Sequence, residues 1–145
     1  MNILVINGPN LNLLGIREPD IYGASSLEEL MTWLETTPEA AGHAFKFFQS
    51  NHEGEIIDTM QDERLWANGI IINPGAFAHY SYAIRDAITS INIDTVEVHM
   101  SDINKREEFR RNSIFPNYCI SQISGMGIDG YVKALSDVCN HSNEE

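Results

Sequence analysis

Ile3-Leu4-Val5-Ile6-Asn7-Gly8-Pro9-Asn10 is the stretch that decides the fold of this chain. Its first four residues form an unbroken apolar run, which is typical of a strand buried on both faces, and the run ends on a polar amide. Such a strand predicts a parallel sheet with helices on each side. From Asn7 to Gly23 we expect a loop of about fifteen residues, a length that is usually functional in a compact domain.

Further apolar runs predict four more strands of the same sheet. These strands are Ala44 to Gln49, Gly69 to Asn73, Thr95 to His99 and Tyr118 to Ile123. The segments between them have apolar residues three and four positions apart, as amphipathic helices do. We expect four helices. The first begins at two overlapping capping boxes, at Ser25 and Ser26. The second has Asn51 as its cap and reaches Leu65, the third runs from Tyr80 to Ile91, and the last runs from Tyr131 to Cys139 and is followed by a frayed tail.

Strands that alternate with helices from end to end predict an α/β fold. The pattern favours a flavodoxin-like, doubly wound three-layer sandwich, with five parallel strands in the order 2-1-3-4-5. We expect residues 1–145 to form a single domain, because the length suits one domain and no linker or repeat is visible. Ligands of such sheets bind where the strand order reverses, so the polar residues that end the strands should converge there: Asn7, Asn10, Asn73 and His99.

The charge balance excludes some classes of partner. A net charge of −12 argues against nucleic-acid binding, which needs a basic surface. No apolar run is long enough to span a membrane, and no signal-peptide pattern is visible, so we expect no membrane partner and a cytoplasmic location. Cys119 and Cys139 have no Cys-x-x-Cys spacing and are expected to be reduced. A small anion would find its counter-charge at Arg17 or at the cluster Arg106, Arg110 and Arg111.

No cofactor or metal motif is evident. The first loop has neither a Gly-x-Gly-x-x-Gly nor a P-loop pattern, and it lacks the Ser and Thr of a flavin phosphate loop. His52-Glu53 lacks the second His of a zinc-binding helix. No Lys follows a strand on the crevice side, which disfavours a Schiff base, and Ser101 and Cys119 have no evident base. We therefore expect a site without metal or cofactor.

Tyr22 is a candidate base, because it lies five residues from the guanidinium of Arg17. An ordinary tyrosine titrates near pH 10, so ionisation at neutral pH needs a close cation. Arg17 is the first candidate for that cation, and Arg106 or Arg110 is the second. The alternative is a surface aromatic side chain without a chemical role.

Two other strand ends carry groups that suit a small ligand. The segment Asn73 to His79 is either a tight turn or the start of a helix whose free N–H groups bind an anion. Glu97 and His99 point to the same face of their strand. Glu97 would orient the imidazole so that His99 acts as a general acid, or the two form a satisfied buried pair. Ser101 can bind a carboxylate.

Five motifs follow one another along nearly the whole chain. The first motif is Ile6 to Gly15, with Arg17-Glu18-Pro19 and Ile21-Tyr22-Gly23. The others are Phe48 to Glu55; Ile72 to Ala76 with His79 and Arg85-Asp86-Ala87; Glu97-Val98-His99 with Ser101, Arg106-Glu107 and Phe109-Arg110; and Ile123-Ser124-Gly125. Together, and in this order, these motifs resemble those of the type II 3-dehydroquinate dehydratases.

The resemblance implies a lyase, a hydro-lyase without cofactor, that converts 3-dehydroquinate to 3-dehydroshikimate by anti elimination through an enolate. It implies that Tyr22 removes the C2 proton, and that Arg17 keeps Tyr22 ionised and closes with the loop. Asn10 would position a water that stabilises the enolate. His99, oriented by Glu97, would protonate the departing C1 hydroxyl.

The resemblance also implies the substrate contacts and the assembly. The binding residues would be Asn73, His79, Ser101, Arg110 and the backbone at Met100. Asp86 would reach the site of a neighbouring subunit, as in a homo-oligomer that is a dodecamer built from trimers. The reaction would serve either the shikimate pathway, toward chorismate and aromatic amino acids, or quinate breakdown.

The chain departs from the family pattern after His99. It has Met100-Ser101-Asp102-Ile103-Asn104 where the family more often has Leu-Ser-Asn-Ile-His, and the charge of Asp102 would weaken anion binding. None of the implied catalytic positions is altered. Two alternatives stay open: a flavodoxin-like module that binds a nucleotide or flavin, and a degenerate structural paralogue.

Overall fold

The computed structural model describes residues 1–144, with the backbone alone for Tyr22 and Glu144. It contains a parallel sheet of five strands: β1 Asn2–Asn7, β2 Ala44–Gln49, β3 Gly69–Asn73, β4 Thr95–His99 and β5 Ser121–Ser124. Their order is β2-β1-β3-β4-β5, which confirms the predicted topology. Asn7 pairs in register with Gln49 on one side and Asn73 on the other, so these three strands end level with one another.

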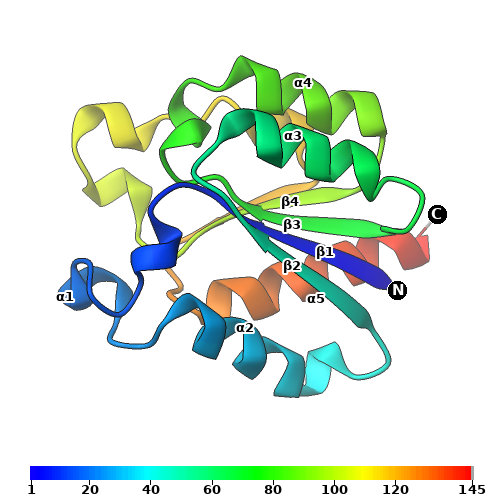
Figure 1. Cartoon of the computed structure of the whole chain (residues 1–145), viewed down its shortest axis with the longest axis horizontal. Helices are drawn as coiled ribbons and strands as arrows, with labels where there is room; N and C mark the ends of the chain where they lie inside the picture. Colours follow the sequence, from blue (N-terminus) through cyan, green and yellow to red (C-terminus); the bar gives the residue numbers. More distant parts are fainter. Residues whose placement is uncertain (145) are drawn as a thin grey trace.

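Helices cover both faces of the sheet (Figure 1). α2 (Leu27–Thr36) and α5 (Asp129–Glu144) lie on one face, and α3 (Glu53–Asp62) and α4 (Tyr82–Ile91) lie on the other. Successive strand residues point to opposite faces, so Ile3 and Val5 join the α2/α5 core while Leu4 and Ile6 join the α3/α4 core. The middle residues of β1 and β3 are therefore apolar on both faces of the sheet, and the three-layer sandwich is confirmed.

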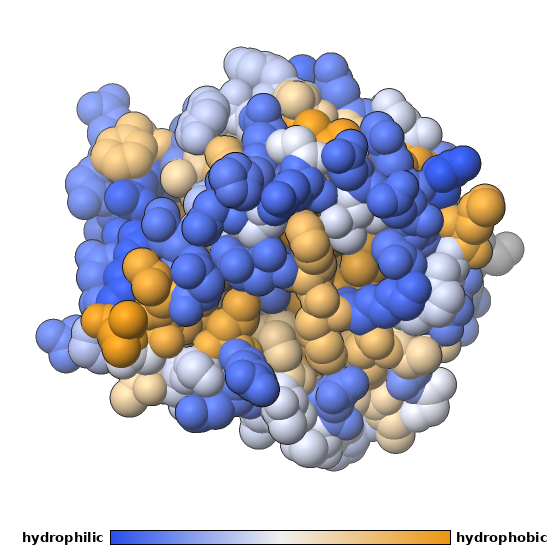
Figure 2. All heavy atoms as spheres, in the orientation of Figure 1, coloured by the Kyte–Doolittle hydropathy of each residue, from blue (hydrophilic) through white to orange (hydrophobic). Residues whose placement is uncertain are grey.

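Short helices interrupt the connections. They are η1 Leu11–Leu13, α1 Pro19–Tyr22, η2 Pro38–Ala40, η3 Gly75–His79, η4 Ile103–Lys105, η5 Glu108–Arg111 and η6 Pro116–Tyr118. The first two lie in the long segment after β1, which is therefore not an irregular loop throughout. Leu11 and Leu14 are buried and anchor that segment, whereas Ile16 is 79% exposed on the part that projects from the molecule (Figures 1 and 2).

Local hydrogen bonds explain where some helices begin. Ser26 caps α2 by accepting from the N–H of Glu29, so the second of the two overlapping capping boxes is the one used. The prediction that Asn51 caps α3 was wrong, because His52 precedes that helix and the Asn51 amide is engaged elsewhere. Leu65 lies beyond the end of α3 and is 90% exposed.

Three other predicted boundaries differ from the structure. α4 begins at Tyr82 because the Ser81 hydroxyl caps it, and the 3-10 helix η3 occupies the residues before Ser81. β5 begins at Ser121, since the segment near Tyr118 forms η6. α5 begins at Asp129 and continues through the predicted frayed tail, where the Ser142 hydroxyl donates to the carbonyl of Val138.

Both cysteines, Cys119 and Cys139, are free thiols. Within residues 1–144, none of the helices has the length and apolar character needed to cross a bilayer. Figure 2 shows several apolar groups on the front of the molecule, among them a strip over the edge strand β2. The rings of Phe45 and Phe47 stack on this strand at 5.8 Å, and Phe47 is 36% exposed.

Candidate active site

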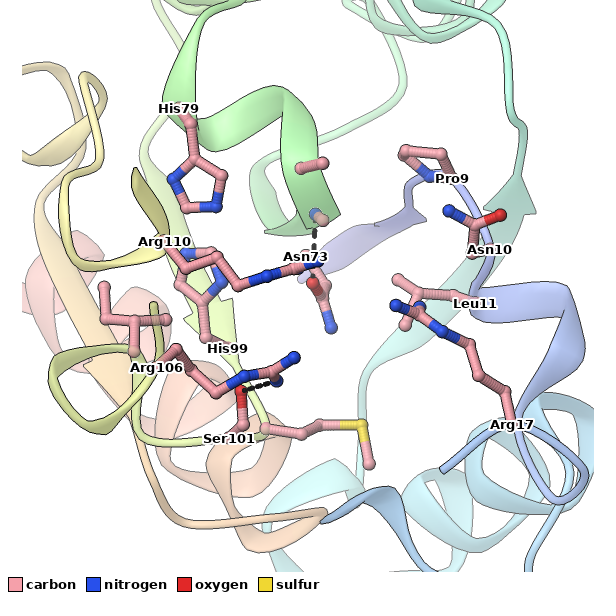
Figure 3. Close-up of a pocket in the computed structure, with 14 residues that line it drawn as sticks. Pro9, Asn10, Leu11, Arg17, Asn73, His79, His99, Ser101, Arg106 and Arg110 are labelled. Atoms are coloured by element: carbon pink, nitrogen blue, oxygen red, sulfur yellow. Dashed lines mark hydrogen bonds between the residues drawn. The ribbon is translucent and has the colours of Figure 1, made fainter. Parts of the chain in front are cut away.

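A polar cleft lies at the carboxyl ends of β1, β3 and β4, where the strand order reverses (Figure 3). The structure brings eight of the predicted site residues to its walls: Asn10, Arg17, Asn73, His79, His99, Met100, Ser101 and Arg110. Figure 3 shows Pro9, Asn10 and Arg17 on one side, with His79, His99 and the two arginines Arg106 and Arg110 on the other. Asn73 lies between the two groups, so a ligand in the cleft would touch both.

The side chain of Glu97 holds the His99 ring in place. Its Oε1 lies 2.6 Å from Nε2 of His99, and the carboxylate is completely buried. The residues alternate along β4 so that both side chains point to the same face, as their spacing predicted. A carboxylate bound to one ring nitrogen fixes the orientation of the ring and leaves the other nitrogen for the ligand side. His99 itself lines the cleft, which is the geometry that a general acid needs.

Two further residues hold Glu97 and were missed from the sequence. The Ser113 hydroxyl donates to Oε1 at 2.6 Å, and the Gln122 amide donates to Oε2 at 3.1 Å. Gln122 is the direct partner of Glu97 across the β4–β5 pair. The register of β5 could have identified Gln122, but the predicted strand began too early; no sequence pattern linked Ser113 to Glu97.

Three arginines give the cleft its positive charge. Arg106, whose side chain is 13% exposed, donates to the Ser101 hydroxyl at 3.2 Å. Arg110 forms an ion pair with Glu107, in which Nε lies 3.0 Å from Oε2. A backbone hydrogen bond, aided by the charges of Arg110 and Arg106, lowers the pKa of Glu107. Arg17, on the opposite wall, forms an ion pair of 3.5 Å with Glu18.

A tight contact between two strand-end loops shapes the floor of the cleft. The N–H of Gly8 donates to the carbonyl of Asn73 at 2.8 Å, and a Cβ on Gly8 would lie 2.6 Å from the Pro74 carbonyl oxygen. Only glycine permits this approach. Asn10 then adopts a left-handed conformation with φ of 69°, and its N–H donates to the Asn51 side chain at 2.9 Å.

The loop after β4 is held in place by β5. The Ser124 hydroxyl donates to the Ser101 carbonyl and accepts from the N–H of Ile103, and the N–H of Gly125 also donates to the Ser101 carbonyl. This accounts for the Ser124-Gly125 motif. Asp102 does not line the cleft: its carboxylate accepts from the N–H of Asn104 and caps η4. Its carboxylate is therefore not among the groups that line the cleft.

Some predicted residues do not reach the cleft of their own chain. Asn7 was expected at the crevice, but it is 99% buried beneath it, because its amide is bonded to other side chains. Asp86 is exposed on α4, and Arg111 lies outside the cleft and donates to the Arg106 carbonyl. The Tyr22 side chain lies outside the described residues. Among the described side chains, no three His, Cys, Asp or Glu residues are grouped so that they could hold a metal ion.

The fold and the site together define a doubly wound α/β protein with a histidine–carboxylate pair in an arginine-lined cleft. The chain belongs to the class II dehydroquinase family, whose model matches residues 1–139. This match favours the dehydratase over the flavin-binding alternative and covers the motifs from β1 to α5.

Relatives and solved structures agree with the family. The chain is 54% identical over 137 residues to a 3-dehydroquinate dehydratase of Clostridium beijerinckii, and the match covers 93% of each chain. It is 52% identical over 135 residues to that of Thermotoga maritima, with 93% and 92% covered. The crystal structure of a type II dehydroquinase from Butyrivibrio crossotus is similar with a TM-score of 0.92 and 48% identity, covering 96% of this chain and 97% of that one.

Proposed function

We propose that the chain converts 3-dehydroquinate to 3-dehydroshikimate and water, as one catalytic domain. The observation that carries this proposal is the His99 ring, held by buried Glu97, in a cleft that arginines line. The substrate is a carboxylate and therefore needs cations to bind. It also loses a hydroxyl group, and this group needs a proton donor to leave as water.

The reaction that suits these groups is an anti elimination in two stages. Tyr22 acts as the base and takes the C2 proton, and the electron pair of the C–H bond forms an enolate with the neighbouring carbonyl. Asn10 positions a water that stabilises the enolate, and Arg17 keeps Tyr22 ionised. The enolate then expels the C1 hydroxyl, His99 donates a proton to it, and water leaves. Glu97 keeps the His99 ring in position throughout.

The remaining cleft residues are proposed to bind the substrate. Arg110 and Ser101 bind its carboxylate, since a guanidinium and a hydroxyl both donate to carboxylate oxygens. Asn73, His79 and the backbone at Met100 bind its hydroxyl groups. All five line the cleft, which supports this assignment.

We also propose that the enzyme acts in the cytoplasm as a homo-oligomer, a dodecamer of trimers, in which Asp86 completes the site of a neighbouring subunit. The exposed position of Asp86 and the apolar β2 edge support self-association. The two free thiols suit a reducing compartment. Mixing the inactive variants Tyr22→Phe and Asp86→Ala tests the shared site, because mixed oligomers regain activity only if one subunit supplies Asp86 to another.

The decisive experiment follows the absorbance of the conjugated enone product when purified protein meets 3-dehydroquinate. One sample receives a chelator, and another is treated with borohydride together with substrate. We expect turnover to survive both treatments, because neither a metal nor a Schiff base has a place in the proposed reaction. Absence of turnover in the untreated sample would contradict the proposal. The same assay does not distinguish the shikimate pathway from quinate breakdown, since both use this reaction.

A further inference from the structure

A chain of four buried side chains runs beneath the cleft from α2 to Asn73. Nδ2 of Asn7 donates to the Met31 sulfur at 3.6 Å, and Oδ1 of Asn7 accepts from the Tyr131 hydroxyl at 2.6 Å. The Tyr131 oxygen in turn accepts from Nδ2 of Asn73 at 3.0 Å. None of these residues is more than 6% exposed.

This chain of hydrogen bonds has a fixed direction, because the group at one end can only accept and the group at the other end can only donate. The thioether of Met31 only accepts, so Asn7 must turn its NH₂ group toward Met31 and its oxygen toward Tyr131. At the other end, the backbone N–H of Gly75 only donates, and it points at Oδ1 of Asn73 at 3.3 Å (Figure 3). Asn73 must therefore turn its NH₂ group toward Tyr131. Both ends dictate the same orientation of every group between them.

This direction matters at Asn73, the one member of the chain that lines the cleft. Rotating an asparagine amide by half a turn exchanges its donor and its acceptor with almost no change of shape. After its internal bonds, Asn73 keeps one lone pair on Oδ1 and one N–H on Nδ2. The position of this remaining donor and acceptor decides which substrate hydroxyl can bind there.

We propose that Tyr131 is a positioning residue that acts through Asn73, because its hydroxyl locks the Asn73 amide in the orientation that binds a hydroxyl of a hydroxy-acid substrate. The inference rests on the function proposed above. Burial raises the pKa of Tyr131, so the hydroxyl keeps the proton that it donates to Asn7. The link joins distant parts of the sequence, since Tyr131 lies in the first turn of α5 and Asn7 ends β1.

Tyr131→Phe removes the hydroxyl and leaves the packing of the ring. We expect the KM for 3-dehydroquinate to rise about five- to tenfold, with a smaller change in kcat, because one oriented hydrogen bond to the substrate is lost. The same substitution in an Asn73→Ala background should change KM no further, since the amide on which it acts is gone. A purely structural role would give equal effects in both backgrounds.

Val138→Ala is the matched control, because Val138 is completely buried on the same helix and takes no part in the hydrogen-bonded chain. It should lower the melting temperature and leave KM unchanged. If Tyr131→Phe does not fold, Asn7→Ala carries the same test, because it removes the acceptor of the Tyr131 hydroxyl.

The inference is overturned, while the proposed function stands, if the wild type is active and Tyr131→Phe has an unchanged KM. The same holds for Asn7→Ala where that variant replaces Tyr131→Phe. An equal loss of kcat/KM in both backgrounds also overturns the inference. A wild-type protein that does not turn over 3-dehydroquinate overturns the proposed function and this inference with it.

Discussion

The Ser113 hydroxyl donates a hydrogen bond of 2.6 Å to Oε1 of Glu97, the oxygen that also holds the His99 ring. Two donors on one oxygen fix the carboxylate in the plane that the ring requires. Gln122 occupies the other oxygen, so the completely buried carboxylate has three partners. A buried carboxylate is costly unless it is paired in this way.

Glu97→Gln and His99→Ala should lower kcat by about 10²- to 10⁴-fold, the usual contribution of an acid–base group. Their effect on KM should be smaller, because neither side chain is proposed to bind the carboxylate. Steady-state kinetics with 3-dehydroquinate check this. Activity within about twofold of wild type in His99→Ala would rule out its role as the acid.

Ser113→Ala should cost about 1–3 kcal/mol of folding free energy, because it leaves the buried carboxylate with one partner fewer. Its kcat should fall less than that of Glu97→Gln. Urea denaturation measures the first effect. Ser90→Ala, at an exposed position on α4, is the control and should be close to neutral. Equal stability of the two variants would contradict the role given to Ser113.

Arg110→Met should raise KM at least about tenfold, since a charge-assisted bond to the substrate carboxylate is lost. The KM of the wild type should also rise with salt, as expected for a charged ligand. Lys105→Gln is the matched control, because the Lys105 side chain is 84% exposed and does not line the cleft. A KM that rises equally in both variants would show a general charge effect instead of a specific contact.

Gly8→Ala should reduce both stability and turnover, because the new methyl group would press against the Pro74 carbonyl and separate the two loops of the cleft floor. Gly54→Ala tests the same chemical change where nothing lies within 4 Å, in helix α3. There, alanine should stabilise the protein by up to about 1 kcal/mol. Thermal unfolding and kcat/KM, measured on both variants, check the contrast.

Cys119 should react slowly with thiol reagents at pH 8. Burial, together with the charge of Glu97, raises the pKa of Cys119 to about 12. At pH 8 only about one molecule in 10⁴ would carry the thiolate, which is the reactive form. The labelling rate should therefore increase as the pH rises. Timed labelling with a chromogenic disulfide on the Cys139→Ser variant measures it. Rapid, pH-independent labelling would contradict the buried position.

The sequence was sufficient for the parts of the fold that periodicity controls. β1 and β3 are apolar runs that end on polar residues, and β4 alternates Val with polar residues. The strand ends Asn73 and His99 meet at the cleft as predicted. The predicted cap of α3 failed because the side chain made a non-local bond. The Asn51 amide binds the backbone of Asn10 instead of capping α3, and no local sequence pattern indicates this bond.

The site was predictable where motifs were long, and the supporting residues were not. Asn10, Arg17 and Arg110 belong to motifs and line the cleft. Ser113 and Tyr131 act through contacts with residues far away in the chain, and such contacts leave no periodic signal. The expectation for Asn7 failed for the same reason, since its amide turns away from the cleft to meet Tyr131.

The bond between Asn7 and Tyr131 joins residues 124 positions apart, and this separation has a consequence for synthesis of the protein. A ribosome releases β1 well before α5, so a nascent chain lacks the hydroxyl that orients Asn73 until α5 has emerged. Contacts between distant positions also form slowly in folding. A nascent chain should therefore bind its substrate more weakly until α5 has been synthesised, even when the sheet has already formed.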